Sequence, residues 1–242
     1  MTTITIGSLE GGGGVELGQL VAQRLGYDYV DRLILAEAAK QAGTTVAALH
    51  EREEVSALGI RDRFFRVLRN LLEQPAWSES DAAMGLYYGA GNLPFLTEDY
   101  EQLPQPPVSS DLIPKDQTYY EAISKVMNDL TERGSVVIVG RGGSYILRGN
   151  QNVLRVGVVA QLEDRIARIM KRSQISHEEA QKLVDERDKA RTYYFKRLFD
   201  VADSMSMEHY HLIVNSSEVS FEYAADMVEQ ACNALEAQRL RR

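Results

Sequence analysis

A run of four glycines, Gly11 to Gly14, constrains the fold more than any other stretch of this sequence. The segment before it, Thr2 to Ile6, is short and β-branched, which predicts a buried strand. The segment after it, Val15 to Leu25, has its leucines and Val21 on one face, which predicts a helix. A glycine-rich turn between a strand and a helix is where α/β sheets bind ligands, because it lies beyond the carboxyl end of the strand.

Two interpretations of the glycine run are open. Bare glycine backbone can approach a phosphate closely, and its N–H groups bind the anion together with the dipole of the following helix. The alternative is a mobile turn without a ligand. Because ordering four glycines costs conformational entropy, their place after the first strand favours phosphate binding. Gly11, Gly12, Gly13, Gly14, Val15 and Glu16 are therefore the candidate phosphate-binding residues.

The run lacks the lysine and the hydroxyl residue that usually complete a phosphate loop. Gly14 stands at the lysine position and Glu16 at the hydroxyl position. The lysine normally neutralises the transferring phosphoryl group, and the hydroxyl holds Mg2+. A carboxylate at Glu16 can hold the metal but repels phosphate, so positive charge must come from elsewhere in the chain.

The composition is that of an ordinary globular protein, with 242 residues, 44% hydrophobic and 26% charged. The net charge of −8 argues against non-specific binding to nucleic acid or anionic membranes. The sequence has no apolar run near the length of a membrane span and no signal-peptide pattern, so we expect a cytoplasmic protein. The single cysteine, Cys232, excludes an intrachain disulfide and is expected in the core.

Strand and helix patterns alternate along both ends of the chain. The further strands are expected at Tyr27–Asp31, Ser135–Gly140, Asn152–Ala160 and His211–Asn215. The further helices are expected at Leu33–Gln41, Tyr119–Arg133, Leu162–Ser173, Ser176–Leu198 and from Phe221 to the C-terminus, with a capping box at Ser176 and Glu179. This alternation predicts an α/β fold in one domain, residues 1–242, with a mostly parallel sheet covered by helices on both faces.

Residues 44–115 break the alternation. Their first part is amphipathic and helical, and their last part is rich in proline. An insertion of this length is usually functional or flexible, so we expect an acceptor-binding or interaction lobe. Its helix "DRFFRVLRNLL" fits a core or a homodimer interface.

Arginines gather on two successive helices. Arg165, Arg168 and Arg172 share one helical face, and Arg187 and Arg191 share a face of the next helix. Joined by the short link "SQIS", residues 160–198 could form a lid over a phosphate chain, because the guanidinium fork grips phosphate oxygens in pairs. The alternative is a solvated face balanced by neighbouring carboxylates.

Two strand ends carry charged residues that belong to the same sheet edge. Arg141 follows an apolar strand and Gly140, and it precedes two further glycines, so it should project from the carboxyl edge. Asp31 ends its strand in the same way. It could orient an acceptor, or it could serve only as a helix cap.

The segment "VIVGRGGSYIL", followed by "NVLRV" and "EDRIARIMKR", resembles the cytidylate kinase-like family of phosphate-loop kinases. The resemblance covers about residues 1–42 and 117–232. It implies a three-layer α/β/α fold, ATP as phosphoryl donor, Mg2+, and a nucleoside monophosphate acceptor, most plausibly CMP. Members of the family often carry an arginine where this chain has Val15.

The resemblance also implies roles for individual residues. The catalytic residues would be Arg141, Arg165, Asp188 and Arg191. Gly11 to Gly14, Arg168 and Arg172 would bind ATP, and Asp31, Arg32, Gly140 and Arg141 would bind the acceptor. By their position in the loop, Val15 and Glu16 complete the candidate ATP-binding residues, and Glu16 is the candidate Mg2+ ligand. Three hypotheses follow. The chain is an active nucleoside monophosphate kinase in which amides and arginines hold the charge, or it is a catalytically weak relative that binds nucleotide as a sensor or assembly component. A kinase for another small acceptor is a third.

Overall fold

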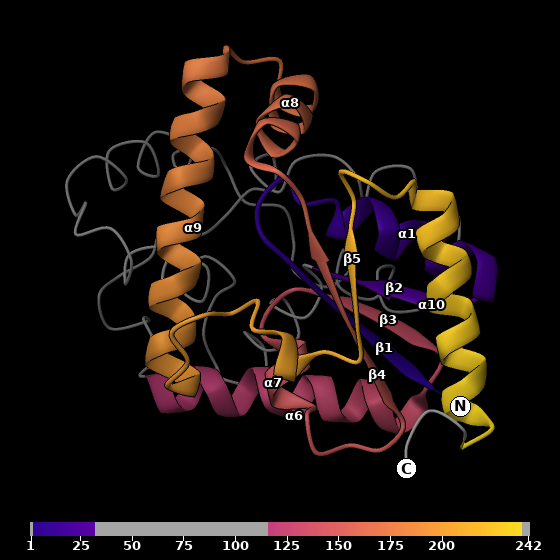
Figure 1. Ribbon diagram of the computed structural model, residues 1–242. Coiled ribbons are helices and arrows are strands. Elements are labelled where there is room, and N and C mark those ends of the chain that lie inside the picture. The colour runs from indigo at the N-terminus through magenta and orange to yellow at the C-terminus, as the bar shows by residue number, and fades with distance from the viewer. Residues whose placement is uncertain (1, 32–115, 239–242) are drawn as a thin grey trace, which may run out of the picture.

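The computed structural model describes residues 2–31 and 116–238 (Figure 1). Arg32, the predicted helix Leu33–Gln41 and the insert at 44–115 lie outside this part of the chain. The described strands form one five-stranded sheet: β1 (Thr3–Ser8), β2 (Asp28–Val30), β3 (Val136–Val139), β4 (Val153–Val159) and β5 (Leu212–Asn215). The order across the sheet is β2-β3-β1-β4-β5, and every pairing is parallel.

Helices cover both faces of this sheet. One face packs against α1 (Gly14–Leu25) and α10 (Phe221–Glu236), and the other against α6 (Asp116–Arg133) and the segment around α7 (Gly143–Ile146). The period of two along the strands causes this division, since Val137 and Val139 of β3 enter the first core while Val136 and Ile138 of the same strand enter the second. The predicted three-layer α/β/α fold is thereby confirmed, and Cys232 lies buried in the first core.

Two helices form a hairpin, α8 (Leu162–Ser173) and α9 (His177–Phe199) (Figure 1). The C-terminal end of α9 packs against the second core through Tyr194 and Leu198. The two helices share a small apolar cluster of their own, made by Ile166 and Ile169 of α8 with Ala180 and Val184 of α9. The predicted capping box is present, because the Ser176 side chain accepts from the Glu179 amide and the Glu179 carboxylate accepts from the Ser176 amide. A 3₁₀ turn, η4 (Met207–His209), then leads into β5. None of the described helices has the length and apolar character to cross a bilayer.

Candidate functional site

The carboxyl ends of all five strands lie at one edge of the sheet, and the predicted site residues of the loops gather there. The glycine run follows β1, Gly140 and Arg141 follow β3, and Asp31 follows β2. Because β1 lies between β3 and β4, the chain leaves it at the point where strand order reverses. Parallel sheets bind ligands at such a point.

Every backbone carbonyl of the loop from Leu9 to Gly13 accepts a hydrogen bond from the protein. The Leu9 carbonyl accepts from the Gly12 amide (2.9 Å), that of Glu10 from Arg165 Nε (2.8 Å), that of Gly11 from Arg168 Nη1 (3.0 Å), that of Gly12 from Ser216 Oγ (2.8 Å), and that of Gly13 from the Leu17 amide (3.0 Å). Each of these carbonyl oxygens is thus directed at a donor of the protein, which keeps it from facing a bound anion.

Among the described residues, most amides from Gly11 to Glu16 have no partner, the exception being the Gly12 amide, which donates to the Leu9 carbonyl. Within residues 2–31 and 116–238, no acceptor is found for the N–H groups of Gly11, Gly13, Gly14, Val15 and Glu16. The last three are the unpaired donors at the start of α1, and its N-cap, Gly13, has no side-chain cap. Five open donors at the positive end of a helix dipole make an anion site.

Two of the glycines are required by backbone conformation and by close packing. Gly11 and Gly13 have φ of 70° and 93°, in the left-handed region. A Cβ on Gly11 would lie 2.5 Å from the Arg165 carbonyl oxygen, and one on Gly13 would lie 2.6 Å from the Phe221 ring. The loop therefore packs directly against α8 and α10.

Ser8 lies close to Gly14, the position where a phosphate loop usually has its lysine. A Cβ at this position would collide with Ser8 Oγ at the end of β1. Any side chain here, lysine included, requires the loop or Ser8 to move. A lysine at Gly14 is therefore compatible with this loop only if the Ser8 side chain turns away or the loop shifts.

Arg165 joins the loop to the lid-like hairpin. Its side chain is only 6% exposed, and Nη2 lies 2.7 and 2.8 Å from the two carboxylate oxygens of Asp188 on α9. With Nε it holds the Glu10 carbonyl. The two predicted catalytic residues are thus brought together, as an ion pair behind the loop.

Arg168 contacts neutral oxygens. It donates to the Gly11 carbonyl, to Ser216 Oγ (3.0 Å) and to the Ser216 carbonyl (2.8 Å), and its guanidinium lies 5.4 Å from the centre of the Phe221 ring. In the part of the chain that the structure describes, no carboxylate pairs with it. Its positive charge therefore lies beside the loop without a counter-charge. Arg172, one turn further, pairs with Glu10 at 2.5 Å in an exposed bridge.

Arg191 lies away from the loop, at the base of α9. Its Nε donates to Ser204 Oγ (2.8 Å), and its guanidinium lies 4.6 Å from the centre of the Phe195 ring. Burial lowers the pKa of Arg191, and burial raises that of Tyr145 in the same aromatic cluster. In this conformation Arg191 anchors α9 to the body of the protein.

The remaining predicted residues lie around the edge of the sheet. Arg141 has φ of 54° between two glycines that are also left-handed, and its carbonyl accepts from Tyr194 Oη (3.3 Å). Asp31 accepts from Tyr29 Oη at 3.2 Å. Val15 and Glu16 are exposed on the first turn of α1. Within the described residues, no three histidine, cysteine or carboxylate side chains group as a ready metal site.

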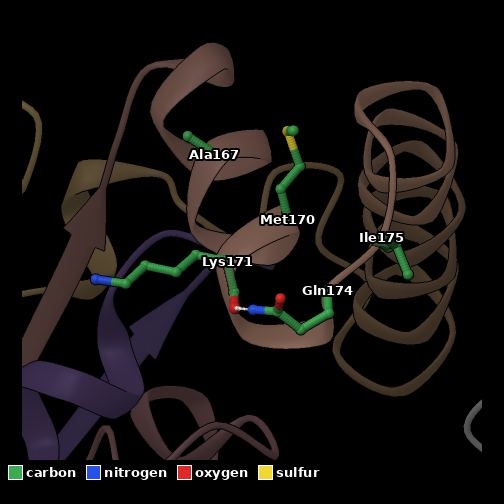
Figure 2. A pocket seen from close by; sticks show the side chains of 5 residues that line it. All are labelled: Ala167, Met170, Lys171, Gln174 and Ile175. Atoms are coloured by element: carbon green, nitrogen blue, oxygen red, sulfur yellow. Dashed lines mark hydrogen bonds between the residues drawn. The ribbon is translucent and has the colours of Figure 1, made fainter.

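The hairpin carries a shallow concave surface that contains none of the predicted residues. It is lined by Ala167, Met170, Lys171, Gln174 and Ile175, beside the turn between α8 and α9 (Figure 2). Three of its residues lie on α8 and two follow its end, and none is one of the three arginines, so this surface is not part of the loop site.

Sequence reasoning missed Ser8, Ser216 and Phe221, which all contact or approach the loop. Ser216 directly follows β5, so the rule that located Arg141 at a strand end could also have found it. Ser8 ends β1 in the same way. Nothing local in the sequence indicates that Phe221 packs against Gly13.

Comparison with known proteins places these features in context. A model of the cytidylate kinase-like family matches residues 3–218. A cytidylate kinase of Methanopyrus kandleri is 26% identical over 121 residues, 47% of this chain, and one of Ignicoccus hospitalis is 31% identical over 110 residues, 45% of this chain. In each case the matched part spans 62% of the relative's length.

The fold recurs in a crystal structure of an uncharacterized protein from Eubacterium ventriosum. That structure matches with a TM-score of 0.57 at 17% identity, covering 96% of this chain and 98% of the other. At this identity the likeness concerns the fold alone.

Proposed function

The chain belongs to the cytidylate kinase-like family, and from this premise we propose that it transfers the γ-phosphoryl group of ATP to a nucleoside monophosphate. CMP is the proposed acceptor, because the two related proteins are named cytidylate kinases. A cytoplasmic location and a homodimer stay predictions from the sequence.

The loop after β1 carries this proposal. Five open amides and five satisfied carbonyls form a surface of hydrogen-bond donors at a helix N-terminus. A polyphosphate, which is rich in acceptors and negative charge, complements such a surface. Arg168 adds a positive charge beside the loop, in place of the lysine that is absent at Gly14.

The other residues are assigned by their place at the same edge. Arg141 would bind the acceptor phosphate, with Asp31 and Gly140 beside it, while Arg165 and Asp188 would hold the hairpin against the donor loop. The donor set fits Mg2+, which commonly binds one or two carboxylates together with substrate phosphates, and Glu16 would be the protein ligand. When bound, the ion neutralises charge on the phosphates.

A second candidate is a nucleotide-binding protein with little or no turnover. Its support is the residue content of the loop: Gly14 and Glu16 stand where a phosphate loop usually has its lysine and its hydroxyl residue, so the loop supplies no ammonium group to the transferring phosphoryl group. A kinase for a small acceptor that is not a nucleotide is a third candidate.

One coupled assay separates these candidates. ADP release is measured with ATP and Mg2+ against CMP, UMP, AMP, GMP and a panel of small hydroxyl acceptors, alongside ATP binding by calorimetry. We expect release that depends on CMP and exceeds the rate without acceptor. Binding of ATP without any acceptor-dependent release would support the second candidate. Absence of ATP binding would contradict the proposed function altogether.

A further inference from the structure

Ser216 connects three parts of the molecule at the glycine loop. Its Oγ donates to the Gly12 carbonyl at 2.8 Å and accepts from Arg168 Nη1 at 3.0 Å, and its own carbonyl accepts from Arg168 Nη2 at 2.8 Å. Arg168 in turn holds the Gly11 carbonyl. We call this unit, Arg168 and Ser216 with the carbonyls of Gly11 and Gly12, the carbonyl clamp.

Peptide geometry links the clamp to the open amides. In a planar trans peptide the C=O and N–H groups point in opposite directions. The Gly12 carbonyl held by Ser216 therefore directs the Gly13 amide away from Ser216. A rotation of that peptide would exchange a donor for a carbonyl oxygen, which repels phosphate. The glycine backbone has little intrinsic resistance to such a rotation, because both signs of φ are accessible to it.

The clamp also leaves the positive charge of Arg168 available to a ligand. Arg168 has only neutral oxygens as partners in the described part of the chain, so forming the clamp does not cancel its positive charge. The same guanidinium orients the loop and raises the local potential. A lysine ammonium would supply the same charge as a compact group, without the planar fork whose separate nitrogens reach the Gly11 and Ser216 carbonyls.

We propose that Ser216 is a positioning residue for the polyphosphate: through the Gly12 carbonyl, and together with Arg168, it keeps the Gly13 amide in its donor-presenting orientation. The inference deepens the proposed function and rests on it. Ser216 acts through the loop backbone, so its loss should weaken binding of the donor and leave binding of the acceptor unchanged.

The test compares Ser216→Ala and Ser216→Thr with Ser217→Ala. The control removes the neighbouring hydroxyl, which accepts from the Gln161 amide and does not touch the loop. Kd is measured by calorimetry for ATP and for inorganic pyrophosphate, KM for ATP and for CMP by the coupled assay, and amide hydrogen exchange over residues 9–17 without ligand. We expect Ser216→Ala to raise the Kd values and the KM for ATP roughly tenfold, with KM for CMP unchanged and faster loop exchange. Ser216→Thr should restore binding to within about threefold, and Ser217→Ala should match the wild type.

A second substitution keeps the test decisive if Ser216→Ala unfolds. Arg168→Lys retains the charge but loses the planar fork, so it should weaken pyrophosphate binding by a similar factor, while Lys171→Ala on the same helix should not. Wild-type binding and exchange in both Ser216→Ala and Arg168→Lys would overturn the inference even if the enzyme is active. Conversely, tight ATP binding that Ser216→Ala weakens, in a protein without turnover, would support the clamp and contradict the kinase proposal.

Discussion

Gly13 and Gly26 bracket α1, and both have left-handed backbone, with φ of 93° and 66°. They differ in their surroundings. A Cβ on Gly13 would lie 2.6 Å from the Phe221 ring, whereas nothing lies within 4 Å of one on Gly26. Alanine at Gly26 therefore tests the effect of backbone strain alone, whereas alanine at Gly13 tests strain together with displacement of the loop.

We expect Gly26→Ala to lower the free energy of unfolding by about 1–2 kcal/mol through strain alone, with ATP binding unchanged. Gly13→Ala should lower it further and should also weaken ATP binding by about tenfold or more, because the loop amides must move away from Phe221. Urea unfolding and calorimetry measure the two effects. Equal ATP affinity in both variants would show that the loop is not the binding element.

At the same scale, the sequence predicted which arginines face the loop but not what they hold. The three- and four-residue spacing of Arg165, Arg168 and Arg172 places them on one face of α8, and all three contact residues 10 to 12 or Ser216. Their direct partners are carbonyls and carboxylates of the protein. Spacing along a helix determines the face, whereas the partner depends on which segment packs there.

Among the elements, the α8–α9 hairpin is joined to the rest of the protein through the C-terminal end of α9, where Tyr194 and Leu198 pack against the second core, and through Arg165 beside the loop. Its apolar cluster is separate from the two cores of the sheet, and the Arg165–Asp188 ion pair lies beside the loop. Since the Arg165 side chain is 6% exposed, its charge loses solvation and needs the Asp188 carboxylate.

We expect Asp188→Asn to lower the free energy of unfolding by about 1–3 kcal/mol, because it leaves the buried guanidinium without a counter-charge. Asp185→Asn, the same change at an exposed position one turn earlier, should stay within about 0.5 kcal/mol of the wild type. Urea denaturation at neutral pH provides the comparison. If the two variants lose the same stability, the ion pair does not hold the hairpin.

For the molecule as a whole, binding of a ligand to the loop should raise the free energy of unfolding and the Tm. The loop contacts α8, α10 and the segment after β5, so a bound polyphosphate would favour the folded state of all of them. At about 100 times its Kd a ligand adds about 2.7 kcal/mol, which for a chain of this size raises Tm by about 5–10 °C.

Scanning calorimetry with ATP and Mg2+ measures this shift, and repeating it with EDTA tests the contribution of the metal. We expect the shift to shrink without Mg2+ and to vanish in Gly13→Ala. An equal shift in Gly13→Ala would locate the nucleotide elsewhere in the protein.

The sequence by itself determined the strands, most helices and the place of the glycine run, because periodicity, β-branched runs and capping residues act over a few neighbouring positions. It did not determine the strand order β2-β3-β1-β4-β5. The short helix α7 was not predicted either, since four residues carry no periodic pattern.

Only the tertiary structure decided how the loop is held. The bonds from Arg165 to Glu10, Arg168 to Gly11 and Ser216 to Gly12 join residues 155, 157 and 204 positions apart. No local pattern encodes such pairs, because they exist only once β1, β4 and β5 lie side by side and bring α8 and the end of β5 against the loop. For the same reason, only the tertiary structure shows that a side chain added at Gly14 would meet Ser8.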